Sequence, residues 1–536
     1  MTHRALQLLT LLSMIAAWTA TTALAFDNAC NDNLVTYWGQ NSYGAAYPND
    51  RDGWQKPLRF YCDEGATDMF PIAFLTNFFS KGGKPTINLA DECNRYDNAT
   101  FPGTDLANCT AGIQDDIKYC QSKGKALTLS LGGATAGAGF QSDEQAIGFA
   151  DTLWNDLLGG SSNTRPFGNA ILDGIDLDIE NGGAAHYPAF LQKLKSYFDA
   201  ADKKYYVTAA PQCVYPDANL QTTLDQFPVD AVYVQFYNNP CGLQTYGQAR
   251  NWNFGMWDYW ARHVSPNPDV KVYIGAPASS TAAGSGYVSL DTLQKITTET
   301  RSSFPSFGGV MFWDTSQAYG NNRLDQNIKD ILKEGASCDP SAFAYPPCDA
   351  PAWSDSGRTY TTGNRVSHKG YIWEAKWSAG SEPTANPMGE WAPVSACEDN
   401  NSIAAAVNSD HGPPSSSANG SSSSSRSSGK ASSTPALETI TIKSPPPPTA
   451  TNQVPTAAIV VTTTVFQNVN PVGGDASNTI PHQDKNCDSI EPWSQSKTYV
   501  GGSKAIHQGQ VWTAKWWSYG DVPSGPAGVW SPSGSC

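Results

Sequence analysis

The stretch LDGIDLDIE, residues 172–180, alternates apolar and acidic residues and decides the fold. Side chains of an extended strand point to opposite faces with a period of two. Asp176, Asp178 and Glu180 therefore share one face, and neighbours in this acidic row lie roughly 7 Å apart. The residues alone leave two interpretations open, which are a solvated face of a strand and a catalytic row of carboxylates.

Residues 27–338 alternate between short apolar segments, which are typical of strands, and segments such as 190–198 that have helical spacing. Eight such units predict an α/β fold, the (β/α)₈ TIM barrel, whose active site forms at the C-terminal ends of the strands. Glu180 falls at that end of the fourth strand. The strands are expected at residues 34–38, 69–74, 126–131, 172–180, 206–210, 231–236, 270–275 and 308–313.

The two ends of the chain differ in composition from its middle, which predicts several units. Residues 1–25 combine an early Arg4, an apolar run and a small-residue cleavage signal, which is the pattern of a secretory signal peptide. The catalytic barrel is expected at residues 26–340. Residues 398–486 are rich in Ser, Pro and Thr, and we expect an extended linker because low apolar content cannot offset the entropy of ordering.

An internal repeat brackets this linker. Cys348 and Cys397 have the same spacing as Cys487 and Cys536, and aromatic positions between them align. Units of this size bury too little apolar surface alone, so a disulfide that closes each unit end to end is expected. The sequence therefore predicts two small β-rich modules, the first module at residues 346–397 and the second module at 487–536.

The tryptophans of the two modules have two interpretations. Some must fill the cores, but units this small cannot bury all of them, so part of the set is expected to bind a ligand. The chain's 17 Trp and 23 Tyr suit neutral ligands with apolar faces, such as sugars. The candidate binding residues are Trp373, Trp377, Trp512, Trp516 and Trp517.

Charge and cysteine content exclude several classes of partner. The chain has 34 basic and 49 acidic residues and a net charge of -15, which opposes nucleic acid. Its 12 cysteines lack metal-ligand spacing, so disulfides of an exported protein are expected and no metal or organic cofactor is. No later stretch is apolar enough to span a membrane. We expect a secreted monomer, extracellular or associated with a cell wall, with glycosylation sequons at Asn98, Asn108, Asn400 and Asn419.

The acidic row with Asp173 resembles the DxxDxDxE signature of family-18 glycoside hydrolases, the chitinases and their relatives. Other motifs agree in order, and they cover essentially the whole barrel. The resemblance favours the catalytic interpretation of the acidic row. SLGG at 130–133 is similar to the family's SxGG motif, and residues 37–41, 209–213, 234–239 and 309–313 resemble strands one, five, six and eight of plant and fungal class III chitinases.

The resemblance implies a role for each carboxylate of the row. Glu180 would protonate the glycosidic oxygen. Asp178 would hold the substrate's N-acetyl group, whose carbonyl oxygen attacks the anomeric carbon in place of an enzyme nucleophile. Asp176 would tune Asp178, and Tyr237 would donate its hydroxyl to the acetamido oxygen. Asp173 points to the opposite face and is expected to be structural.

The resemblance also implies substrate contacts and bridges. Gln235 and Gln40 would contact the sugars, and Trp313 would form the floor of the site. Residues 81–110 form a longer segment than the resemblance leads us to expect. The implied disulfides are Cys213–Cys241, Cys62–Cys120 and Cys93–Cys109, and we infer Cys30–Cys338 from the pair that remains.

The resemblance implies a secreted endochitinase that hydrolyses β-1,4-linked N-acetylglucosamine polymers with retention. The Tyr and Trp pattern of the repeats resembles small chitin- and cellulose-binding modules, which would anchor the enzyme to chitin. One alternative is an endo-β-N-acetylglucosaminidase acting on N-glycans, which needs no polymer anchor. The other is a non-catalytic chitin-binding lectin, a class that usually lacks the residue equivalent to Glu180.

Overall fold

The structure of the chain is a computed structural model. It describes residues 25–134, 137–181, 183, 185–398, 490–494, 498–499, 503–514, 518–519, 522–523 and 530–535. Trp516, Trp517 and nearly all of the expected signal peptide and linker lie outside these residues. None of the helices among the described residues is both long enough and apolar enough to cross a lipid bilayer.

Eight parallel strands close into a barrel, because β1 pairs with both β9 and β2. A ninth strand, β3 (Thr86–Ile87), runs antiparallel to β2 outside the barrel. Each barrel strand overlaps one of the eight predicted segments, so the TIM barrel is confirmed. The strands are β1 (Asn33–Thr36), β2 (Met69–Asn77), β4 (Ala126–Gly132), β5 (Gly174–Asp178), β6 (Tyr206–Ala209), β7 (Ala231–Gln235), β8 (Lys271–Pro277) and β9 (Phe307–Trp313).

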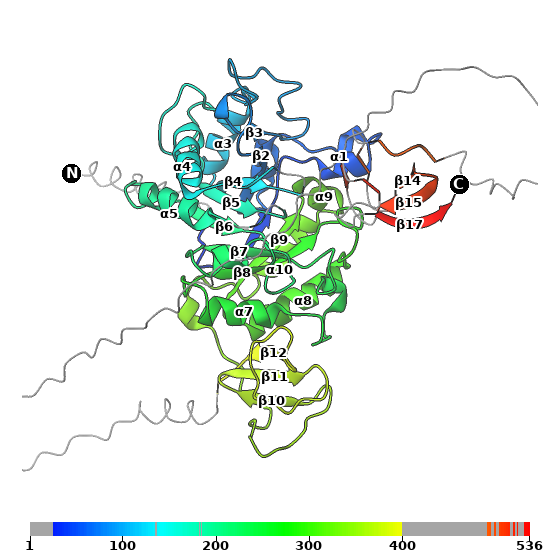
Figure 1. Cartoon of the computed structure of the whole chain (residues 1–536). Coiled ribbons are helices and arrows are strands. Elements are labelled where there is room, and N and C mark those ends of the chain that lie inside the picture. The colour runs from blue at the N-terminus through cyan, green and yellow to red at the C-terminus, as the bar shows by residue number, and fades with distance from the viewer. Residues whose placement is uncertain are drawn as a thin grey trace, which may run out of the picture. The chain divides into compact units, whose positions relative to one another are not determined.

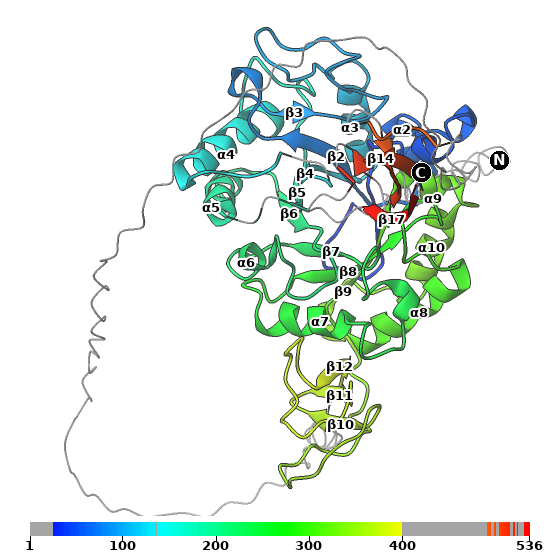
Figure 2. The same ribbon diagram turned by 45° about the vertical axis from the view of Figure 1, so that its right-hand side comes forward.

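Helices surround the strands on the outside of the barrel (Figure 1, Figure 2). The predicted helix around residues 190–198 is α5, which buries Phe190, Leu191 and Leu194 on its inner face. The α-helices are α1 (Ser42–Ala46), α2 (Leu58–Glu64), α3 (Ile113–Ser122), α4 (Asp143–Leu157), α5 (Tyr187–Phe198), α6 (Gln221–Leu224), α7 (Phe254–His263), α8 (Leu290–Ser303), α9 (Thr315–Gly320) and α10 (Leu324–Lys333). Short 3₁₀ turns lie at Arg51–Gly53, Lys81–Gly83, Leu243–Thr245 and Pro340–Ala342.

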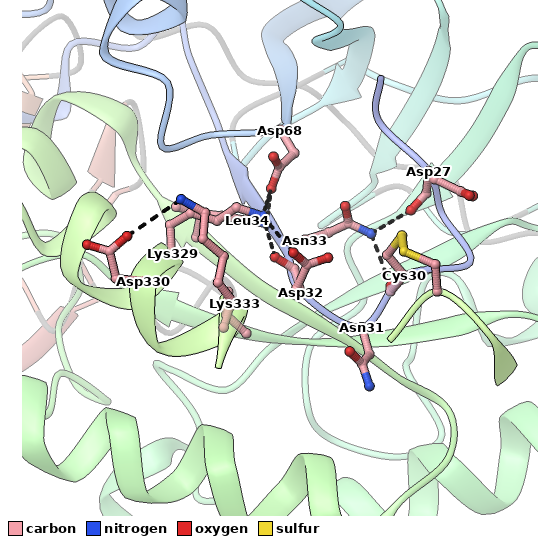
Figure 3. A network of polar contacts seen from close by, with 12 residues as sticks. Asp27, Cys30, Asn31, Asp32, Asn33, Leu34, Asp68, Lys329, Asp330 and Lys333 are labelled. Atoms are coloured by element: carbon pink, nitrogen blue, oxygen red, sulfur yellow. Dashed lines mark hydrogen bonds and ion pairs between the residues drawn. A yellow bond between two sulfur atoms is a disulfide. The ribbon is translucent and has the colours of Figure 1, made fainter. Parts of the chain in front are cut away.

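A buried lysine joins the last barrel helix to the first two strands (Figure 3). The Nζ atom of Lys329 lies 2.8 Å from a carboxylate oxygen of Asp68 and 3.3 Å from one of Asp32. Asp68 also accepts the backbone N–H of Leu34 at 2.8 Å. Because Asp68 directly precedes β2 and Leu34 lies on β1, this network holds the seam where the barrel closes.

The disulfides follow the expected pairing. The two ends of the barrel are joined by Cys30–Cys338, and the first module is closed by Cys348–Cys397. The expected closure of the second module by Cys487 and Cys536 lies outside the described residues. The other bridges, all within the barrel, are Cys62–Cys120, Cys93–Cys109 and Cys213–Cys241.

The two modules are small antiparallel sheets, as predicted. In each module the indole N–H of one tryptophan donates to the backbone carbonyl five residues earlier, from Trp373 to His368 at 2.9 Å and from Trp512 to His507 at 3.3 Å. The internal repeat is therefore also a structural repeat. The strands are β10 (Arg365–His368), β11 (Tyr371–Ala375) and β12 (Trp391–Ala396) in the first module, and β13 (Thr498–Tyr499), β14 (Lys504–His507), β15 (Gln510–Ala514), β16 (Ser518–Tyr519) and β17 (Trp530–Ser535) in the second.

The first module shares a buried polar contact with helix α7 of the barrel. The hydroxyl of Tyr371 donates to a carboxylate oxygen of Asp258 at 2.7 Å, and both side chains are fully buried. The other oxygen of Asp258 accepts the hydroxyl of Ser306 at 2.6 Å. Burial raises the pKa of Asp258 in spite of these donors. The second module has the exposed Gln510 at the position of Tyr371, so this contact is specific to the first copy.

We predict that Tyr371→Phe destabilises the chain by about 1–3 kcal/mol, because a buried carboxylate oxygen loses its closest donor and keeps only Arg262, at 3.6 Å. Urea unfolding of the full chain measures the change. The matched control is Tyr43→Phe, which removes a Tyr–Asp hydrogen bond to Asp50 at the surface and is expected to cost less than about 0.5 kcal/mol. Equal small losses for both variants would contradict a stabilising role for the contact.

Candidate active site

The inner end of the acidic row is held by hydroxyl groups from the two neighbouring strands β4 and β6 and from Tyr37, which directly follows β1. Asp176 is fully buried and accepts hydrogen bonds from the hydroxyls of Tyr37, Ser130 and Thr208, each at 2.7 Å. Burial raises the pKa of Asp176, and the three hydroxyl donors counter that rise. The carboxylate is thus fixed in one orientation beneath Asp178.

Asp178 is the carboxylate of the row whose charged form is disfavoured by burial and by three neighbouring carboxylates. It is 4% exposed, and one oxygen accepts the side-chain amide of Gln235 at 3.0 Å. Burial raises the pKa of Asp178 well above its ordinary value, and the charges of Glu180, Asp176 and Asp217 add to the rise. The amide of Gln235 also donates to the backbone oxygen of Ala210, so Gln235 orients Asp178 from a fixed position.

Glu180 lies just beyond β5 and is partly exposed. Burial, followed by the charge of Asp217, raises the pKa of Glu180 to about 7. A carboxyl with such a pKa holds its proton near neutral pH and can act as a general acid.

Asp217 is a member of this site that sequence reasoning missed. Its carboxylate is 7% exposed and accepts three backbone N–H groups, those of Gln212, Asn219 and Leu220. It lies in the loop after β6, where no periodic pattern marks it. Only its place four residues after the quoted motif at 209–213 connects it with the site.

Close strand packing brings β4 against the acidic row. Gly132 has a φ of +110°, and a Cβ atom there would lie 2.3 Å from the backbone oxygen of Asp178. Only glycine accommodates both the backbone conformation and this approach. The SLGG sequence at 130–133 therefore contributes a hydroxyl to Asp176 through Ser130 and a close backbone contact through Gly132.

Aromatic rings form one wall beside the carboxylates. The ring of Trp313, at the end of β9, stacks on that of Phe74, with the centroids 5.8 Å apart and the ring planes at 17°. The centroid of the Tyr37 ring also lies 5.8 Å from that of Trp313. Tyr37 therefore joins the aromatic wall to Asp176. Phe74 is a second residue that the sequence did not single out. Tyr237 is buried, and burial followed by the charge of Asp178 raises its pKa well above the ordinary value, which places its ring beside the row.

Gln40 lies one loop away from the acidic row. Its amide donates to the backbone oxygens of Ala73 and Asn88, both at 2.9 Å. These bonds tie the chain after β1 to the chain after β2 and β3. The side-chain NH₂ group of Gln40 is thus already engaged by the protein, and its side-chain oxygen is the polar atom left for the predicted substrate contact.

The structure does not present all of the expected module tryptophans to solvent. Trp373 is 1% exposed, and its indole N–H is bonded inside the first module, so the prediction of an open ring face at Trp373 is not met. The repeated indole bond explains why, since it turns the ring into the core. Trp377 and Trp512 keep partial exposure, and Trp377 lies under the guanidinium of Arg250.

The chain matches a known family over most of the barrel and part of the first module. Residues 35–376, more than half of the chain, match the family described as "Glycosyl hydrolases family 18". The chain belongs to glycosyl hydrolase family 18. The resemblance stated from the DxxDxDxE signature and the ordered strand motifs is thereby confirmed for the family.

Several proteins that are named as chitinases are similar to this chain. "Chitinase 2" of Rhizopus oligosporus is 43% identical over 324 residues, which cover 60% of this chain and 56% of that protein. "Endochitinase" of Saccharomyces cerevisiae is 41% identical over 310 residues, with 58% and 51% covered. "Class III chitinase" of Arthroderma benhamiae is 43% identical over 285 residues, which cover 50% of this chain and 84% of that protein. This similarity indicates that the chain is class III-like. The chain thus spans little more than half the length of the first two.

We predict that Asp217→Asn lowers the pKa of Glu180 from about 7, because removing a neighbouring negative charge makes ionisation easier. Carbon-13 NMR titration of labelled glutamate carboxyls in the full chain measures this shift. The control Asp115→Asn removes an exposed carboxylate from α3 and should leave the titration unchanged. An unchanged pKa in Asp217→Asn would contradict the electrostatic coupling.

Proposed function

We propose that the chain is a secreted endochitinase that hydrolyses β-1,4 linkages of N-acetylglucosamine polymers with retention of configuration. The observation that carries this proposal is a carboxyl with a pKa of about 7, Glu180, next to the buried Asp178 and an aromatic wall. Membership of family 18 and the similarity to proteins named chitinase and endochitinase support it.

In the proposed mechanism, Glu180 gives its proton to the glycosidic oxygen as the bond to the anomeric carbon breaks. Asp178 accepts the acetamido N–H of the same sugar, so the acetamido carbonyl oxygen attacks the anomeric carbon. Ionised Glu180 then takes a proton from water, which opens the intermediate with net retention. The raised pKa of Asp178 fits this role, because a buried carboxylate with a single amide donor is stabilised by a positive charge that develops beside it.

The surrounding residues would position the sugar. Tyr237 would donate its hydroxyl to the acetamido oxygen, and Trp313 would stack under the sugar at the point of cleavage. Gln235 and Asp176 would act through Asp178, because their observed bonds hold that carboxylate or the strand beneath it.

We propose that export and polymer anchoring complete the function. Disulfides within the barrel and the first module suit an oxidising compartment outside the cytosol. Two tethered modules would raise the effective concentration of the barrel on an insoluble polymer. Trp377 and Trp512 are the described candidates for this binding because both keep partial exposure.

We predict that Glu180→Gln lowers the release of reducing ends from colloidal chitin by about 10²–10⁴-fold, because an amide cannot supply the proton. Pull-down by insoluble chitin should remain at the wild-type level. The matched control Glu144→Gln changes an exposed glutamate at the start of α4 and should retain full activity. Wild-type hydrolysis by Glu180→Gln would overturn the mechanism.

We predict that combining Trp377→Ala with Trp512→Ala lowers retention on insoluble chitin by about fivefold, because stacking surface is lost. Hydrolysis of short soluble oligomers should not change. The corresponding double phenylalanine variant keeps an aromatic ring at each position and should retain most of the binding. Full retention by the double alanine variant would contradict the anchoring role of these two residues.

A further inference from the structure

A cavity of about 520 Å³ lies beside the proposed active site, between the chain after β1 and the chain after β3. One of its walls comes from residues 81–110, the segment that is longer than the family resemblance led us to expect. We call it the Tyr96 cavity. The residues that define its chemistry are Trp54, Asn88, Asp91, Asn94, Tyr96 and Asp97.

The wall of the Tyr96 cavity is held in place by a disulfide and by side-chain hydrogen bonds. Cys93 is bonded to Cys109, and the neighbouring Asn94 is buried. The side-chain amide of Asn94 donates to Asp97 at 2.7 Å, and its oxygen accepts the backbone N–H of Tyr96 at 2.7 Å. These bonds fix Tyr96 and Asp97 at the cavity although both are exposed.

The wall of the Tyr96 cavity is hydrogen-bonded to the strand that carries the aromatic wall of the active site. Asn88, which lines the cavity, exchanges two backbone hydrogen bonds with Phe74, both at 3.0 Å. Phe74 in turn stacks on Trp313. Gln40 lines the cavity as well and donates to the backbone oxygen of Asn88. A polymer lying along this wall would therefore reach the cavity.

The composition of the lining favours a saccharide that carries a positive charge. Trp54 and Tyr96 offer ring surface, with Tyr96 80% exposed, and the amides offer polar contacts to hydroxyls. Within the described part of the chain, neither Asp91 nor Asp97 forms an ion pair. Arg95, which lies between them in sequence, is paired with Asp105 at 2.9 Å.

Nearby charges leave this side of the molecule acidic. Arg51 lies over the ring of Trp54, with its guanidinium carbon 4.6 Å from the centroid. Arg95 likewise lies over the ring of Tyr96, with its guanidinium carbon 4.9 Å from the centroid, and it is paired with Asp105. Against these two cations stand Asp105, Asp91, Asp97 and Glu92, whose pKa is raised to about 7 by burial and by the charge of Asp91. The whole chain carries a net charge of -15, which attracts a cationic polymer.

We propose that the Tyr96 cavity is a distal subsite that prefers a glucosamine unit, so that the substrate is partially deacetylated chitin. The ammonium group of glucosamine pairs with Asp91 and Asp97 while its ring lies against Tyr96 or Trp54. The inference rests on the proposed function. That mechanism requires an acetamido group at the cleavage point, so the two subsites select different units of one mixed polymer.

Binding to the full chain in the Glu180→Gln background tests the subsite without catalysis. Calorimetry compares a long partly deacetylated oligomer with a fully acetylated one of equal length, at low and high salt. We expect Asp91→Asn combined with Asp97→Asn to weaken binding of the partly deacetylated oligomer about fivefold at low salt, with no change for the acetylated one. Added salt should remove the difference.

Two controls separate the possible outcomes. Asp115→Asn combined with Asp202→Asn removes the same charge from exposed positions elsewhere and should change binding of neither oligomer. Equal weakening by this control, or equal weakening of both oligomers by the Asp91 and Asp97 variant, would overturn the proposed preference. If wild-type protein hydrolyses neither oligomer while the charge-dependent binding is observed, the proposed function fails and the subsite stands.

Discussion

The burial of a row of carboxylates inside the barrel is the constraint on which the rest of the structure depends. An unpaired buried carboxylate costs several kcal/mol, so each member of the row needs either donors or a proton. The donors to Asp176 come from Ser130 on β4, Thr208 on β6 and Tyr37 directly after β1. Only a closed barrel brings these three strands around β5, and the Lys329 network holds the seam where it closes.

The number of side-chain hydrogen-bond donors falls from Asp176 to Glu180. This difference suits the inner carboxylate to remain ionised and the outer ones to hold a proton. Asp176 has three hydroxyl donors and Asp178 has one amide donor, whereas no side chain among the described residues donates to Glu180, whose pKa is raised. The outer two carboxyls therefore hold a proton between them near neutral pH. Glu180 is the partly exposed member of this pair, so a substrate oxygen can reach the shared proton there. Asp217 reinforces this placement from the neighbouring loop.

All eight barrel strands could be predicted because each is a short apolar run bounded by turn residues, a local property of the sequence. The carboxylates of the row followed from alternation, and their roles from a motif. Phe74 and Asp217 could not be predicted as site residues, because their proximity to the row depends on how a distant strand and a distant loop meet after closure. Trp373 was named as a candidate binding residue because a sequence pattern does not show which face of a small bulged sheet is the core. The bulge lies between Ile372 and Trp373.

The two copies of the repeat differ at one position, Tyr371 in the first module and Gln510 in the second, that decides which copy contacts the barrel through this position. Both copies keep the indole bond and an edge-to-face aromatic pair, Tyr360 with Trp391 and Tyr499 with Trp530, so the shared contacts of the module do not depend on the position of Tyr371. In the first copy the residue at this position donates a hydrogen bond to Asp258, a buried carboxylate on helix α7 of the barrel. Separation of the first module would leave one oxygen of Asp258 without its closest donor. The first module is consequently part of the barrel's core, whereas the exposed Gln510 places no such demand on the second.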